Sequence, residues 1–118
     1  MTATLYGISN CDTVKKARAW LAGHGVDHRF HDFRKDGVPA AELRDWLQRF
    51  GWDRVVNRQG STWRRLDPAA QARVCDEASA HAFLVEHPSA IKRPVVQWPG
   101  GERTLGFDPA AWSLLPRR

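Results

Sequence analysis

The chain has 118 residues, of which 42% are hydrophobic and 26% are charged, and its formal net charge is +5. This length suits one domain with a core of its own, so we expect a single domain over residues 1–118. No apolar run approaches the ~20 residues of a membrane-spanning helix, and the N-terminus lacks the basic and then apolar pattern of a signal peptide. Two cysteines exclude a disulfide framework and favour a reducing compartment, which predicts a cytoplasmic protein.

The positive charge is spread along the chain and forms no basic tail. Eighteen Lys and Arg residues stand against thirteen Asp and Glu residues. A basic balance suits either nucleic acid or a small anionic substrate, and the scatter of these residues favours the small anion. We therefore expect no nucleic-acid partner. We also expect no membrane partner and a monomeric protein.

The first third of the chain predicts a βαβ unit. Residues 3–8 form a short apolar strand, and the following helix carries an apolar stripe and ends at Gly23. Residues 26–33 then alternate as a second strand. A strand, a crossover helix and a strand within about 30 residues place the two strands parallel.

The middle of the chain, residues 39–88, predicts an all-helical insertion. Helical spacing of apolar residues predicts a helix over 39–50, and residues 52–56 form a short helix or a turn. Residues 57–62 read as a polar loop. Two further helices follow. One is opened by Asp67-Pro68, with Ala70, Val74 and Cys75 facing inward, and one covers residues 79–87 and carries the apolar residues Ala82, Phe83 and Val85.

The last part of the chain predicts a ββα unit. Residues 91–98 enter a third strand through a proline, residues 99–102 form a hairpin turn, and residues 103–107 return antiparallel. A short helix begins at Asp108-Pro109. A βαβ unit joined to a ββα unit, with a cysteine after the first strand, predicts an α/β, thioredoxin-like fold with a mixed four-stranded sheet and the helical insertion.

Cys11 is the main candidate for chemistry. Ser9 or Asn10 can cap the helix that begins beside it, and helix N-termini favour a thiolate over a thiol. Cations near a helix start oppose its dipole, so a nearby thiolate or bound anion explains the basic run that follows Cys11 better than helix stability does. The alternative is a buried structural cysteine. The neighbours of Cys11 are polar, which favours a nucleophilic role: Asn10, Asp12 and Thr13. Asp12 is placed to accept hydrogen bonds from the first N–H groups of the helix, and Lys15 follows one turn later.

Val14 stands where a CxxC motif would place its second cysteine. Disulfide chemistry must therefore use Cys75 or an external thiol such as glutathione. Cys75 lies in an apolar helical pattern, which favours core packing, although its separation in sequence does not forbid a pair with Cys11.

Two basic elements can add an anion site. A cis bond at Arg93-Pro94, just before a strand, would turn the backbone of Arg93 toward the cysteine loop; a trans proline with a solvated arginine is the alternative. Arg58, Arg64 and Arg65 surround a Gly-Ser-Thr loop that can contact an anion or can simply be solvated. The histidines point apart, so we expect no metal site: His24, His28 and His31.

Four sequence blocks in this order resemble the ArsC-like family of arsenate reductase homologues, and most of all its YffB-type branch, which sits beside the Spx regulators. The blocks are Tyr6–Arg18, His31–Gly37, Gly60-x-Thr62-Trp63-Arg64 and Ile91–Pro94. The resemblance implies a bacterial thioredoxin-like protein with a helical insertion. It also implies that Cys11 is the nucleophile and that Arg93, next to a cis Pro94, binds an anion.

Two departures from the family pattern argue against efficient arsenate reduction. Gln59 occupies the place of a loop arginine, with Arg58 one position earlier, and Gly106-Phe107 stand where arsenate reductases have a further arginine. The sequence therefore predicts a glutathione-dependent thiol-disulfide reductase with no tightly bound cofactor. Its expected binding residues for substrate or glutathione are Asn10, Asp12, Thr13, Lys15, Arg58, Arg93 and Pro94. The rivals are a glutaredoxin-coupled arsenate reductase and, outside enzymes, a Spx-like regulator that binds RNA polymerase.

Overall fold

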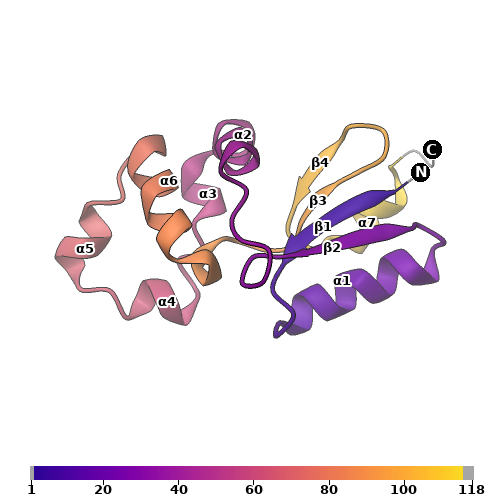
Figure 1. Ribbon diagram of the computed structural model, residues 1–118, viewed down its shortest axis with the longest axis horizontal. Helices are drawn as coiled ribbons and strands as arrows, with labels where there is room; N and C mark the ends of the chain where they lie inside the picture. Colours follow the sequence, from indigo (N-terminus) through magenta and orange to yellow (C-terminus); the bar gives the residue numbers. More distant parts are fainter. Residues whose placement is uncertain (1, 116–118) are drawn as a thin grey trace. The chain divides into compact units, whose positions relative to one another are not determined.

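The computed structural model describes residues 2–115 (Figure 1). The four strands appear in the predicted order, but Ser61–Arg64 form a short helix where the sequence predicted a polar loop over residues 57–62. The elements are β1 Ala3–Gly7, α1 Asp12–Gly23, β2 His28–Asp32, α2 Ala40–Phe50, α3 Trp52–Val55, α4 Ser61–Arg64, α5 Pro68–Ala72, α6 Glu77–Glu86, the 3-10 helix η1 Pro88–Ala90, β3 Val95–Gln97, β4 Arg103–Leu105 and α7 Pro109–Ser113. None of the helices within this range is long and apolar enough to cross a membrane.

The described residues divide into two compact units. Residues 2–36 and 93–115 form the sheet unit, and Gly37–Lys92 forms the helical unit. That residues 39–88 are an insertion into a single domain stays a prediction.

The sheet unit contains one mixed four-stranded sheet with strand order β2-β1-β3-β4. β1 pairs parallel to β2, with Leu5 opposite Phe30, and antiparallel to β3, with Leu5 opposite Val96. β3 and β4 form the predicted antiparallel hairpin. The α/β, thioredoxin-like fold predicted from the sequence is confirmed.

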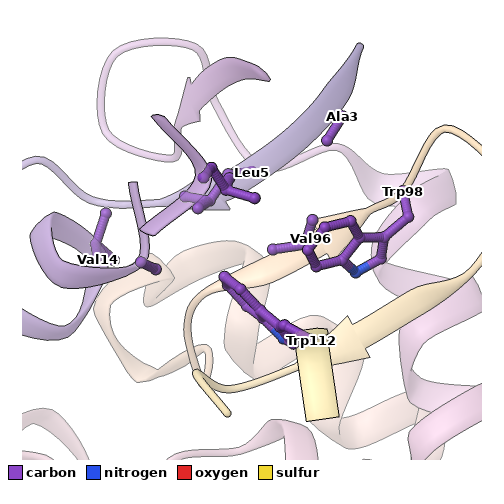
Figure 2. Packing of buried hydrophobic residues seen from close by; sticks show 8 residues of the cluster. Ala3, Leu5, Val14, Val96, Trp98 and Trp112 are labelled. Carbon is purple, nitrogen blue, oxygen red and sulfur yellow. The ribbon is translucent and has the colours of Figure 1, made fainter. Parts of the chain in front are cut away.

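One face of this sheet packs against α1 and α7. Leu5 and Val96 point from adjacent strands toward Val14 of α1 and Trp112 of α7, and these side chains are almost completely buried (Figure 2). Ala17 and Leu21 follow Val14 on the same buried face of α1. This packing fixes where α1 begins relative to the end of β1.

Three indole rings of the sheet unit form an aromatic cluster. The ring of Trp112 lies edge-on to the rings of Trp98 and Trp20, with centroids 5.0 and 5.4 Å apart, and Trp20 and Trp98 are 6.5 Å apart. The Trp98 Nε1–H donates to the hydroxyl of Thr104 at 2.9 Å. The cluster therefore joins α1, β3, β4 and α7.

The backbone of β1 approaches α1 closely at Gly7. A Cβ atom at this position would lie 2.7 Å from Cγ2 and 3.4 Å from Cγ1 of Val14. Such a distance is well inside van der Waals contact, so only glycine allows β1 and the first turn of α1 to meet in this way.

The helical unit contains α2 to α6 and η1. Its core includes Leu43, Trp46 and Leu47 on one side of α2, as the spacing of the apolar residues predicts. On α6 the buried residues are Ala80 and Leu84, whereas Val85 is 43% exposed. Ala80 and Leu84, four residues apart, therefore line the buried face, whereas Ala82 and Val85, two of the apolar residues noted from the sequence, are exposed.

Cys75 is exposed and free, which contradicts its predicted place in the core. It lies between α5 and α6, in a turn that ends at a capping box. In this box the Asp76 carboxylate accepts from the backbone N–H of Ser79 at 2.8 Å, and the Ser79 hydroxyl accepts from the backbone N–H of Asp76 at 3.1 Å. The capping box begins a new helix at Glu77, so Cys75 is not part of a continuous helical face.

Candidate active site

Cys11 is the N-cap of α1 and is partly exposed. Its backbone is extended (φ −146°, ψ 122°), and its carbonyl oxygen accepts the first helical hydrogen bond from the N–H of Lys15 at 3.0 Å. The prediction that Ser9 or Asn10 caps this helix is wrong, since both residues precede the cap and are exposed. The cysteine itself therefore faces the free N–H groups of the first turn.

The surroundings of Cys11 favour its thiolate. Burial by itself would raise the pKa of the Cys11 thiol, but this effect is outweighed. The backbone N–H of Val14, a hydrogen bond and positive charge from Arg93, and the backbone N–H of Thr13 together hold the pKa below its ordinary value. A thiol with a lowered pKa and partial exposure is a good nucleophile and a good leaving group.

Arg93 reaches this thiol from the segment that enters β3. The Arg93-Pro94 peptide bond is cis, which is the isomer that the family resemblance implies. Pro94 is buried, and its carbonyl oxygen accepts from the N–H of Gly106 at 2.8 Å. Because Val95 pairs with Tyr6 near the end of β1, the start of β3 lies beside the strand that leads to Cys11.

The remaining polar residues of the turn lie around the cysteine and are exposed: Asn10, Asp12, Thr13 and Lys15. Thr13 acts on Cys11 through its backbone N–H. The predicted capping by the Asp12 side chain is wrong, because among the described residues its carboxylate accepts no hydrogen bond from the N–H groups of the first turn.

Arg58 belongs to the helical unit and is held by two tryptophans. Its guanidinium carbon lies 5.4 Å from the ring centroid of Trp52 and 5.9 Å from that of Trp63. The loop is tightened by Asn57, whose side-chain oxygen accepts from the N–H of Gln59 at 3.2 Å. The sequence-based prediction did not include this contact of Arg58 with Trp52 and Trp63. An arginine between two tryptophans that are close in sequence does, however, indicate a cation–π contact.

The three candidate histidines have separate surroundings. His24 stacks on the Trp20 ring at 3.8 Å, His28 accepts a hydrogen bond from Arg18 Nε at 3.2 Å, and the His31 ring lies 4.9 Å from that of Tyr6. In the part of the chain that the structure describes, no group of three or more His, Cys, Asp or Glu side chains is arranged to hold a metal ion.

The strand order and a cysteine at the start of α1 define this chain as a thioredoxin-like α/β protein with one activated thiol. Its family follows from the comparison with known proteins. The ArsC family model matches residues 6–114, and the chain belongs to the ArsC family.

Three similar proteins extend this assignment over nearly the whole chain. An uncharacterized protein of Haemophilus influenzae is 44% identical over 105 residues, which are 89% of this chain and 90% of the relative. The structure of a protein called YFFB matches with a TM-score of 0.87 and 46% identity, covering 94% of this chain and 96% of that one. An arsenate reductase (ArsC) related protein from Brucella melitensis matches with a TM-score of 0.75 and 42% identity, covering 96% of this chain and 92% of that one.

Proposed function

We propose that the protein is an oxidoreductase that reduces mixed disulfides with glutathione, using Cys11 as its single nucleophile. The observation that carries the proposal is the lowered pKa of a partly exposed thiol at the N-terminus of α1. Val14 occupies the position of a second active-site cysteine, so the thiol that resolves the intermediate is Cys75 or an external thiol, and in this proposal it is glutathione. Membership of the ArsC family supports the assignment to thiol redox enzymes.

The reaction takes place in two exchanges. The Cys11 thiolate attacks the glutathione sulfur of a glutathionylated thiol, the substrate S–S bond breaks, and the substrate sulfur leaves as a thiolate that takes up a proton. A second glutathione, as its thiolate, attacks the glutathione sulfur of the Cys11 mixed disulfide. Oxidised glutathione forms and the Cys11 thiolate is released, so two glutathionyl groups end as one disulfide while the substrate disulfide is reduced.

The neighbouring residues would bind and orient the thiols. Arg93, beside Pro94, stabilises the thiolate and can pair with a glutathione carboxylate, and Lys15 adds positive potential. Asn10, Asp12 and Thr13 shape the turn.

Arg58, in the helical unit, is a further arginine for an anionic group. Its two tryptophans restrict the side chain, so less freedom is lost when it binds. We further propose a monomer in the reducing cytoplasm, with glutaredoxin as an alternative electron donor.

The first test measures the reactivity of Cys11. In a Cys75→Ser background, the rate of alkylation by iodoacetamide as a function of pH reports the Cys11 pKa directly. The expected midpoint lies below the ~8.5 of a free thiol. A midpoint at or above that value would refute the assignment of Cys11 as an activated nucleophile.

The second test measures turnover of a glutathionylated peptide with glutathione and glutathione reductase. Cys11→Ser should abolish turnover, and Cys75→Ser, at an exposed thiol of the other unit, should leave it unchanged. Equal activity in Cys11→Ser and in the unsubstituted protein would refute the proposal.

Arsenate reduction is the second candidate. It is favoured by the family and by the name of the Brucella melitensis protein. Gln59 and Gly106-Phe107 weaken it, since they remove expected oxyanion arginines. Arsenate-dependent NADPH oxidation with glutathione, glutaredoxin and glutathione reductase, lost in Cys11→Ser, would establish it; no oxidation above the protein-free rate would exclude it.

A further inference from the structure

The sheet face turned away from α1 and α7 carries a row of polar side chains that the thiol chemistry does not use. The pairing registers put Arg29 of β2 opposite Thr4 of β1, Thr4 opposite Gln97 of β3, and Gln97 opposite Arg103 of β4. Since side chains alternate between faces along each strand, all four point to the face opposite Leu5 and Val96. We call these four residues, Arg29, Thr4, Gln97 and Arg103, the polar row.

The polar row has donors that lack acceptors. The Arg103 Nη1–H donates to the carbonyl oxygen of Gly101, while its Nε is buried without a hydrogen-bond partner among the described residues. Neither Arg29 nor Arg103 forms a salt bridge with a carboxylate of the described residues, in contrast to Arg49, which pairs with Asp45. A buried donor without an acceptor is rare, and the guanidinium of Arg103 carries further N–H groups that an approaching carboxylate can use.

The row also opens into a hollow at its β2 end. The hollow has a volume of about 350 Å³ and is lined by Thr4, Tyr6, Arg29, Phe30, His31 and Asp36. Asp36 contributes the acidic group of this lining, and one of its carboxylate oxygens already accepts from the backbone N–H of Asp32 at 2.9 Å. The hollow therefore offers a guanidinium and a hydroxyl to an incoming anionic group.

We propose that the polar row binds an extended acidic segment of a partner protein. Three strand spacings of about 4.8 Å separate the Cα atoms of Arg29 and Arg103 by roughly 14 Å. An extended peptide advances about 3.3 Å per residue, so acidic side chains four residues apart span about 13 Å. One carboxylate meets each arginine, and Thr4 and Gln97 hydrogen-bond the peptide groups between them.

Two alternative roles fit the row less well. Arginine on the edge strand β2 can serve to prevent edge-to-edge pairing, but this does not account for the buried Nε of Arg103. Single-stranded nucleic acid binds sheet faces through bases stacked on exposed aromatic rings. Tyr6 lies two residues from Thr4 on the same face of β1, but it is only 6% exposed and its ring packs against His31 and Phe33.

The test uses a fluorescein-labelled, end-blocked peptide Glu-Gly-Ser-Gly-Glu and measures anisotropy at low ionic strength. Loss of both arginines in R29Q/R103Q should weaken binding about tenfold, and R29Q alone, at an exposed site, about threefold. The matched control R54Q/R73Q removes two exposed positive charges from the helical unit and should change affinity less than about twofold. Amide shift mapping should place the peptide at Thr4 and Gln97.

Several outcomes would overturn the proposal. One is an equal loss of affinity in R54Q/R73Q, which would mean non-specific attraction. A second is equal binding of Glu-Glu-Gly-Ser-Gly, which would remove the spacing argument. A third is tighter binding of a thymidine octanucleotide at the same residues, which would assign the row to nucleic acid. Peptide binding should persist in Cys11→Ser, so this proposal and the reductase proposal can fail separately.

Discussion

Replacing Gly7 with alanine tests the close approach of β1 to the first turn of α1. The added Cβ would lie 2.7 Å from Cγ2 of Val14, a residue that is 1% exposed. A valine in a helix has one strongly preferred χ1 rotamer and cannot rotate away without cost. Overpacking of this kind costs about 1–3 kcal/mol, which for a chain of this size lowers Tm by about 4–12 °C.

A double-mutant cycle with Val14→Ala isolates the contact. Val14→Ala alone removes two methyl groups and leaves a cavity, at a cost of about 2 kcal/mol. In the Gly7→Ala/Val14→Ala protein the new methyl group fills part of that space. The double variant should therefore be more stable than the sum of the two single changes predicts, by about 1 kcal/mol or more.

Urea denaturation followed by circular dichroism gives the four free energies of unfolding. Gly23→Ala serves as the matched control, because a Cβ there meets no atom within 4 Å and should stabilise α1 by about 0.5–1 kcal/mol. Gly7→Ala should also affect the thiol. If the added Cβ displaces the first turn of α1, the contact of the Val14 N–H with Cys11 weakens and the pKa of Cys11 rises. Additive free energies in the cycle, within about 0.3–0.5 kcal/mol, would refute the reasoning.

Three further changes probe other parts of the sheet unit. Arg93→Gln should raise the pKa of Cys11 in the alkylation assay, because it removes the positive charge that favours the thiolate. The control Lys92→Gln, at an exposed residue one position earlier, should leave this pKa unchanged. Burial and the charge of Arg18 hold the pKa of His28 below its ordinary value. The unfolded chain thus binds more protons, so stability should fall as pH drops through about 6.5, and His28→Asn should flatten that dependence in urea melts. Asp108→Ala should destabilise the protein by about 1 kcal/mol in the same assay, since its carboxylate caps α7 at 3.1 Å; an unchanged midpoint would contradict that role.

The parts of the fold that could be predicted are those that local sequence determines. The apolar run of β1, the stripe on α1 and the proline before β3 each follow from the period of side chains or from the chemistry of one residue. Asp67-Pro68 and Asp108-Pro109 predict the starts of α5 and α7, and in both helices the aspartate caps the first turn.

The errors arose where tertiary packing or a second local signal decided the structure. Cys75 follows an apolar pattern, but the Asp-x-x-Ser capping box after it starts a new helix and leaves the thiol exposed. At the first helix, two good capping residues precede Cys11, and yet the cysteine takes the cap position. The contact of Arg93 with this thiol joins residues far apart in sequence, so its expectation came from the proline before β3 and from the family resemblance, and not from spacing.

The distribution of tryptophan has a consequence for how the protein can be observed. Of the six tryptophans, Trp20, Trp98 and Trp112 lie in the sheet unit, and Trp46, Trp52 and Trp63 lie in the helical unit. Total emission therefore reports both units at once. The edge-on indoles of the sheet unit, 5.0 to 6.5 Å apart, are close enough to couple as excitons, and their near-ultraviolet dichroism gives that unit a spectroscopic signature of its own. Following the two signals in one denaturation would show whether the halves of this chain unfold together.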